Sequence, residues 1–221
     1  NKGDSLAVST DSGDLYNAVI TRITETACRL TLTPTFNEDQ SDSLEPDMTL
    51  YQCLLKGTKF ETVVRQAIEC GVTTIVPIIT SRTIPVLDKK NTPKKLERWN
   101  RIVTEALQQS GRAAGCKVSK PVNLRDIRLD AGQNGLFFHE KSLAKASLHM
   151  YLSNSPQRVA LLTGPEGGLS PQETDLLIQK EFKPVHLGPG VLRAETAAVY
   201  ALAAVRTILR EKPSWKPDRK E

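Results

Sequence analysis

The apolar positions divide the chain into two parts with different periodicities. In the first part, "DSLAVST" (4–10) and "LYNAVITRITETACRLTLTP" (15–34) are rich in residues that favour strands, and "DSGD" between them is a turn signal. Two or three strands bury little core, so we expect residues 1–47 to be part of a small β domain with its linker. The polar and acidic stretch 36–47 is typical of that linker.

From residue 48 onward, short apolar runs alternate with segments of helical period, which predicts an α/β domain with a mostly parallel sheet. The expected strands are "MTLYQCLL" (48–55), "VTTIVPIIT" (72–80), "GLFFHE" (135–140), "RVALLTG" (158–164) and "KPVHLG" (183–188). The Ala-rich segment 193–210 is a strong helix. We therefore expect one domain over 48–212, followed by a polar tail at 213–221.

Capping residues mark three expected helix starts. Thr58 and Glu61 predict a capping box, for a helix with one apolar face (Phe60, Val63, Val64, Ala67, Ile68) and Gly71 at its end. Thr92 and Pro93 predict an N-cap and first-turn proline, for a helix whose stripe is Leu96, Trp99, Ile102, Val103, Ala106 and Leu107. A second capping box, at Ser170, Pro171 and Glu173, indicates that the segment 161–173 leads into a helix N-terminus.

Composition narrows the class of protein but does not choose its partner. Hydrophobic residues are 39% of the 221 and charged residues 25%, the balance of a soluble globular protein. The formal charge of +5 fits either a solvated surface or a polyanionic partner such as nucleic acid. No run approaches the roughly 18 apolar residues of a membrane span. We expect a cytoplasmic protein.

The cysteines and histidines predict no metal site. No CxxC pair or zinc-ligand spacing occurs among Cys28, Cys53, Cys70 and Cys116, so reduced thiols are expected. The three histidines are dispersed, and His139 and His186 lie in apolar strands where a core position is expected.

Two glycine-rich segments follow expected strands, "LLTGPEGGLSPQE" (161–173) and "LGPGVLRAET" (187–196). The first lacks the final Gly and the Lys of a phosphate-binding Walker loop, and Arg193 stands where a dinucleotide fingerprint needs its third glycine. Neither contains the G-x-S-x-G of a nucleophile elbow. Two interpretations remain: the backbone closely approaches a flat, uncharged group, or Gly164, Gly167 and Gly168 only provide positive φ angles in a tight turn.

The pair "LLTGPEGGLSPQE" and "HLGPGVLRAETAAVYALA" resembles the signature motifs of the uracil-N3 methyltransferases of 16S ribosomal RNA, the RsmE family of the SPOUT class. "LLKGTKFETVVRQAIECGVTTIVPIITSRT" and "KLERWNRIVTEALQQSGR" are similar to the family's upstream segments, so the resemblance covers roughly 48–210. It implies a SPOUT-type trefoil-knotted α/β domain that binds S-adenosylmethionine and forms a homodimer. It also implies a preceding PUA-like RNA-binding β-barrel, of which residues 1–47 resemble only a truncated part.

The resemblance assigns residues to cofactor, RNA and catalysis. It implies a cofactor pocket made by Glu140, Leu162, Thr163, Gly164, Pro165, Glu166, Gly167, Gly168, Leu187, Gly188, Val191, Leu192 and Thr196. It implies contacts to 16S ribosomal RNA of the small subunit from Arg112, with Gln109 before it, where a charge that compensates the helix dipole is the alternative. Lys56 and Arg82 follow expected strand ends and are further expected RNA contacts. For Lys94, Lys95, Arg98 and Arg101, a solvated helical face is expected rather than an RNA contact. The Ala-rich run 197–204 fits the family's dimer interface or a tightly packed core helix.

Arg193 and Glu195 are the expected catalytic residues. Methylation at N3 requires loss of a weakly acidic proton, and a guanidinium suits stabilisation of the resulting anion. The alternative is a helix-end arginine that pairs with Glu195. Glu195 and Glu166 could orient Arg193, accept a proton or balance the cofactor's charge. Two other functions stay open: methylation of another RNA position such as a ribose 2′-oxygen, and a non-catalytic RNA-binding or assembly factor.

Overall fold

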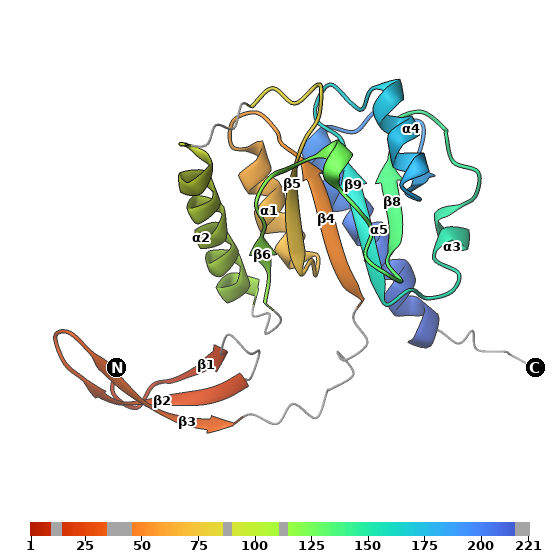
Figure 1. Cartoon of the computed structure of the whole chain (residues 1–221). Helices are drawn as coiled ribbons and strands as arrows, with labels where there is room; N and C mark the ends of the chain where they lie inside the picture. The colour runs from red at the N-terminus through yellow and green to blue at the C-terminus, as the bar shows by residue number, and fades with distance from the viewer. Residues whose placement is uncertain (10–14, 35–45, 86–89, 111–114, 215–221) are drawn as a thin grey trace, which may run out of the picture. The chain divides into compact units, whose positions relative to one another are not determined.

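A computed structural model describes residues 1–9, 15–34, 46–85, 90–110 and 115–214, and Figure 1 shows its elements. The chain divides into two compact units. The first comprises Asn1–Ser43 with Gly111–Gly115, and the second comprises Leu44–Ser110 with Cys116–Glu221.

The first unit is an antiparallel sheet of β1 (Ser5–Ser9), β2 (Leu15–Ile23) and β3 (Cys28–Pro34), in the order β1-β2-β3. The predicted β structure is therefore confirmed. Among the described side chains of this unit, Ala18 alone is buried, and β3 is exposed along its whole length. Three strands bury little core, as expected. The expected turn "DSGD" and most of the expected linker lie outside the described residues.

The second unit is built on a parallel sheet with the strand order β10-β8-β9-β4-β5-β6, and with β7 beside β5. Figure 1 labels β8, β9, β4, β5 and β6 in this order. Its strands are β4 (Asp47–Cys53), β5 (Thr74–Ile79), β6 (Lys117–Val118), β7 (Val122–Asn123), β8 (Asn134–Phe138), β9 (Arg158–Thr163) and β10 (Lys183–Val185). All five predicted strands are confirmed. The strands β6 and β7 were not predicted, because two residues are too few to show a period.

Helices cover both faces of this sheet. They are α1 (Lys59–Glu69), α2 (Thr92–Ser110), the 3-10 helix η2 (Leu124–Asp126), α3 (Leu148–Tyr151), α4 (Pro171–Gln179) and α5 (Ala194–Ser214). Leu161 packs with α1, α2 and α5 in one apolar cluster, whereas its neighbour Leu162 packs with η2 and α4 in a second. Successive strand residues point to opposite faces, so both sides of the sheet are buried, as the apolar strands require. The α/β class with a mostly parallel sheet is confirmed.

The helix faces were predicted better than the helix starts. All five apolar residues expected on α1 are buried. Ser170 caps α4 with the predicted reciprocal bonds to Glu173. The capping box at Thr58 is wrong, because Thr58 has helical angles (φ −90°, ψ 0°) and its side chain accepts no cap bond. Glu61 instead accepts a hydrogen bond of 2.7 Å from Arg98 Nη2 on α2. Thr92 is the first residue of α2 rather than its cap.

A polar pair is buried between two central strands. Thr163 at the end of β9 donates a hydrogen bond of 2.7 Å from Oγ1 to Gln52 Oε1 on β4, and both residues are at most 1% exposed. Gln52 Nε2 donates in turn to the Cys53 carbonyl at 2.9 Å. These bonds satisfy the buried groups and join β9 to β4 just before the loops that follow them. None of the described helices is long and apolar enough to cross a membrane.

Candidate functional site

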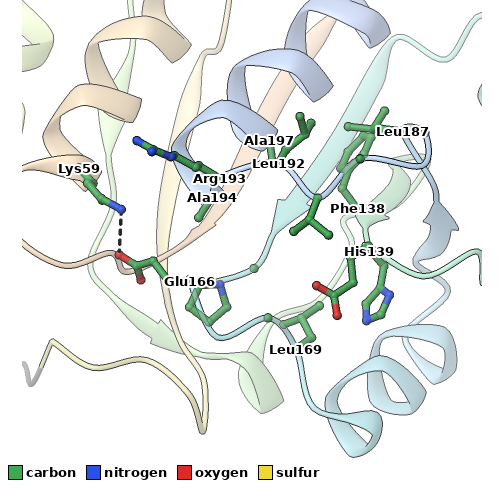
Figure 2. A pocket seen from close by; sticks show the side chains of 17 residues that line it. Lys59, Phe138, His139, Glu166, Leu169, Leu187, Leu192, Arg193, Ala194 and Ala197 are labelled. Carbon is green, nitrogen blue, oxygen red and sulfur yellow. Dashed lines mark ion pairs between the residues drawn. The ribbon is translucent and has the colours of Figure 1, made fainter.

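A cavity of about 410 Å³ opens beyond the carboxyl ends of β8, β9 and β10 (Figure 2). Its walls come from the end of β8 and the residues after it (138–140), from the 164–169 loop and from the 187–194 loop, with Ala197 of α5 and Lys59 of α1. Helices α4 and α5 pack on opposite faces of the sheet, so the cavity lies where the chain changes face. In open parallel sheets this is where ligands bind, and the volume suits a small molecule.

Two glycines in the cavity wall have backbone conformations that other residues rarely adopt. Gly168 has φ +67° and Gly188 has φ +128°, and a Cβ at either would meet no atom within 4 Å. Backbone conformation, not packing, therefore requires glycine at both positions. Of the three glycines for which the alternative interpretation required a positive φ, only Gly168 has one. A Cβ at Gly164 would instead meet Leu169, and one at Gly167 would meet the side chain of Arg82.

The loop after β5 holds the glycine loop in place. Arg82 Nη1 donates hydrogen bonds to the carbonyl oxygens of Gly167 (2.8 Å) and Leu169 (3.4 Å). Beside it, the backbone N–H of Ser81 donates to Glu173 Oε1 at 2.8 Å. Burial raises the pKa of Glu173, but the bonds from Ser170 and Ser81 outweigh it and leave that pKa below its ordinary value. Arg82 thus supports the cavity wall, besides its predicted contact with RNA.

Glu166 ties the glycine loop to the start of α1. Its Oε1 accepts a hydrogen bond of 3.0 Å from the backbone N–H of Lys56 and lies 3.9 Å from Lys59 Nζ, the contact dashed in Figure 2. The strand β4 pairs directly with β9, so the segment after β4 lies beside the loop after β9. The geometry therefore supports an anchoring role for Glu166.

Opposite charges meet on this side of the cavity. Lys59 Nζ lies 3.5 Å from Glu195 Oε2 as well as 3.9 Å from Glu166. The pKa of Glu195 is lowered by a hydrogen bond from its own backbone N–H, and further by the charges of Lys59 and Arg193, although burial opposes the shift. Arg193 is exposed, and in Figure 2 its side chain extends toward Lys59. Glu195 is thus paired with Lys59, and Arg193 adds a more distant positive charge.

His139 is not a core residue, contrary to the prediction. It is half-buried and lines the cavity, because β8 ends at Phe138 and the next residues turn into the wall. Its Nδ1 accepts a hydrogen bond of 3.0 Å from the backbone N–H of Lys141. In the neutral ring this bond places the proton on Nε2, which is then a donor. His186 is half-buried, with Nδ1 3.4 Å from the His139 carbonyl oxygen.

The structure brings most of the predicted cofactor residues to one cavity. Those in its wall, together with the predicted catalytic Arg193, are Glu140, Gly164, Pro165, Glu166, Gly168, Leu187, Gly188, Val191 and Leu192. Leu162 and Thr163 do not line it, because they are buried strand residues below the loop. Gly167, Glu195 and Thr196 also lie outside its wall.

Three of the predicted RNA contacts lie on the surface, and several cavity residues were not predicted. Lys56, Arg82 and Gln109 are exposed, and Arg112 lies outside the described residues. The wall also contains residues that the sequence reasoning did not assign to the site: Lys59, Phe138, His139, Leu169, Gly190, Ala194 and Ala197. Most of these directly adjoin predicted positions. Lys59 does not, and its only sequence signal is that it follows a strand end in "LLKGTK". Within the described part of the chain, no cluster of His, Cys, Asp or Glu could hold a metal ion.

Comparison with known proteins decides the family. The model of the RNA methyltransferase domain matches residues 43–206, which is most of the chain. The chain belongs to this RNA methyltransferase family. It is 36% identical over 212 residues to the ribosomal RNA small subunit methyltransferase E of Synechocystis sp., covering 94% of this chain and 67% of the relative. The enzyme of the same name from Aquifex aeolicus is 39% identical over 166 residues, covering 73% of this chain and 69% of the relative.

Solved structures of methyltransferases share the fold. A ribosomal RNA small subunit methyltransferase E from Neisseria gonorrhoeae, bound to S-adenosyl methionine, superposes with a TM-score of 0.83 at 25% identity. A structure from Legionella pneumophila in complex with the cofactor SAM gives 0.82 at 30% identity. Each comparison covers 94% of this chain and 84% of the other. The resemblance found in the sequence motifs is confirmed.

Proposed function

We propose that the chain binds S-adenosylmethionine in the cavity and transfers its methyl group to N3 of a uridine in 16S ribosomal RNA of the small subunit. One observation carries the proposal: two glycine-bearing loops and the end of β8 enclose a small-molecule cavity with Arg193 in its wall. The relatives named ribosomal RNA small subunit methyltransferase E support the substrate, and the two SAM-bound structures support the cofactor.

The cavity residues fit this cofactor. Apolar side chains (Phe138, Leu187, Leu192) suit a flat ring, and the open backbone at Gly188 suits hydrogen bonds to it. No residue pattern for binding phosphates occurs in either loop, which agrees with a cofactor that carries none. The carboxylate of Glu140 supplies negative charge toward a cation. When bound, S-adenosylmethionine provides a methyl group on a positively charged sulfonium.

Arg193 is the residue we assign to the target base. The N3 proton must pass to solvent water before or during methylation, and the negative charge then spreads onto the two neighbouring carbonyl oxygens. An exposed guanidinium at the cavity supplies a permanent positive charge and a fork of donors for those oxygens. Glu195 has a lowered pKa, which makes it a weak proton acceptor. We therefore assign Glu195 to orientation and charge balance.

The remaining assignments extend the same proposal. The β1–β3 sheet is part of a PUA-like RNA-binding domain, and Lys56, Arg82, Gln109 and Arg112 contact the RNA. The second unit is a trefoil-knotted SPOUT domain, and it acts as a cytoplasmic homodimer through the Ala-rich part of α5. The exposure of Lys56, Arg82 and Gln109 supports the RNA contacts, and the half-exposed Tyr200 of α5 (51%) supports an interface there.

The test is methyl transfer to small ribosomal subunits that lack the modification. With tritiated S-adenosylmethionine, we expect label in the ribosomal RNA, and nucleoside mapping should place it on N3 of uridine. Label on a ribose 2′-oxygen would refute the position, and no binding of the cofactor by calorimetry would refute the enzyme.

A second experiment tests the role of Arg193. Arg193→Ala should abolish transfer while cofactor affinity changes by less than about threefold, because the guanidinium serves the base and not the cofactor. Unchanged turnover would remove Arg193 from the reaction.

A further inference from the structure

Three charged side chains meet at the side of the cavity formed by α1 and the start of α5, and a fourth lies on the same side. The Lys59 ammonium lies 3.5 Å from Glu195 Oε2 and 3.9 Å from Glu166 Oε1. Lys59 is 42% exposed, whereas Glu166 and Glu195 are 24% and 20% exposed. One lysine therefore faces two carboxylates that are largely withdrawn from water. The fourth group is the Arg193 guanidinium.

Glu195 depends on Lys59 for its counter-charge. Its Oε2 is fully covered and, among the described residues, accepts no hydrogen bond that meets normal geometry. The ammonium of Lys59 at 3.5 Å is the cation that faces this oxygen. A covered carboxylate oxygen without a cation or donor is costly, so loss of Lys59 would drive Glu195 toward another partner.

Arg193 is the cation nearest to Glu195 along the chain. It stands two residues before Glu195, and its charge already contributes to lowering the pKa of that carboxyl. Within the described part of the chain, no carboxylate lies within 4.0 Å of its guanidinium. A guanidinium binds carboxylates by two parallel bonds, more strongly than an ammonium does. Arg193 would therefore be captured if Glu195 were released.

We propose that Lys59 is a positioning residue, which holds Glu195 and Glu166 and thereby keeps the Arg193 guanidinium unpaired for the anionic form of the target base. This inference rests on the proposed function, because that function assigns Arg193 to the base. Lys59 acts through its neighbours. It determines whether the carboxylate of Glu195 pairs with the Lys59 ammonium or with the Arg193 guanidinium.

The first test needs no cofactor and no RNA. Phenylglyoxal modifies unpaired guanidinium groups, and peptide mass spectrometry can follow its addition to Arg193. We expect Lys59→Met to slow this modification by about tenfold, which corresponds to about 1.4 kcal/mol of pairing between Arg193 and Glu195. Lys59→Arg, which keeps the charge, should leave the rate near that of the wild type. Lys120→Met, which removes an exposed lysine outside the cavity wall, is the matched control.

The double variant Lys59→Met with Glu195→Gln makes the test decisive. Without the Glu195 carboxylate the acceptor two residues from Arg193 is gone, so the modification rate of Arg193 should recover toward that of the wild type. Methyl transfer should follow the same order: the turnover number falls about tenfold in Lys59→Met and recovers in the double variant. A lysine that contacted the substrate itself would not be rescued by the change at Glu195.

The outcomes separate this inference from the proposed function. Unchanged reactivity of Arg193 in Lys59→Met, or a double variant that stays as slow as the single one, overturns the role of Lys59. If the wild-type protein transfers no methyl group to small subunits, the proposed function fails, but the modification rates still decide whether Lys59 keeps Arg193 unpaired. Thermal unfolding of each variant shows whether a slow rate reflects misfolding. If Lys59→Met misfolds, Lys59→Gln replaces it, both alone and combined with Glu195→Gln.

Discussion

Replacement of Gly188 by alanine tests whether the cavity depends on backbone conformation. Gly188 has φ +128°, and a Cβ there would meet no atom within 4 Å, so steric overlap adds nothing to the cost. Forcing an L-residue into such a region costs about 2 kcal/mol. For a domain of this size we expect the unfolding temperature to fall by roughly 4–8 °C. If the loop instead changes conformation, the same free energy appears as a loss of about 30-fold in S-adenosylmethionine affinity.

Gly190 provides the matched control in the same loop. It also has open space around its Cβ position, and its φ lies outside the positive region. Gly190→Ala should therefore change the free energy of unfolding by less than about 0.5 kcal/mol. The measurements are thermal unfolding and isothermal titration calorimetry with S-adenosylmethionine on the purified variants. If Gly188→Ala matches Gly190→Ala in both, the glycine is not required by its backbone angle and the reasoning is refuted.

Three further predictions concern the contacts that support the cavity. Thr163→Val leaves the buried Gln52 Oε1 without its donor, so it should destabilise the protein by about 1–3 kcal/mol in urea unfolding. Thr163→Ser keeps the hydroxyl and should not. Equal stability of the two variants would contradict this. Arg82→Met removes the hydrogen bond to the Gly167 carbonyl and should weaken S-adenosylmethionine binding by about tenfold in calorimetry. Arg65→Met, on the exposed side of α1, is the control and should not weaken it. Equal affinities of the two variants would count against the loop contact. Because the folded-state pKa of Glu173 is lowered, its contribution to stability is present above the ordinary pKa of 4.5 and is lost as the pH falls toward the folded value. The difference in unfolding free energy between wild type and Glu173→Gln should therefore shrink below pH 4.5. A difference that stays constant with pH would refute this prediction.

The sheet and its helical faces could be predicted because their periods are local. Apolar residues at helical spacing predicted which side of α1 is buried, and apolar runs between turn signals predicted β4, β5, β8, β9 and β10. The short β6 and β7 exist because β5 offers them a pairing edge, which no local period encodes. Thr58 has the residue type of a cap without its geometry, since the preceding turn gives it helical angles.

The site was predicted in outline but not in its charges. The motifs located the two glycine loops, and these do line one cavity. They also suggested Leu162 and Thr163, which the strand keeps in the core because loop residues begin only at Gly164. Lys59 could not be found from spacing. It reaches the cavity because β4 pairs with β9, and strand order depends on the packing of the whole sheet.

The contacts that hold the glycine loop all join distant parts of the chain. Arg82 and Gly167 are 85 positions apart, and Lys56 and Glu166 are 110 apart. The loop after β9 can take its shape only after β4 and β5 lie beside that strand, since both anchors come from the ends of those strands. A ligand that requires this shape binds the folded sheet and not the unfolded chain, so its binding stabilises the whole second unit. Weakening either anchor should therefore reduce the stabilisation by the ligand more than it reduces the stability of the ligand-free protein. That difference separates a residue that shapes the cavity from one that only supports the fold.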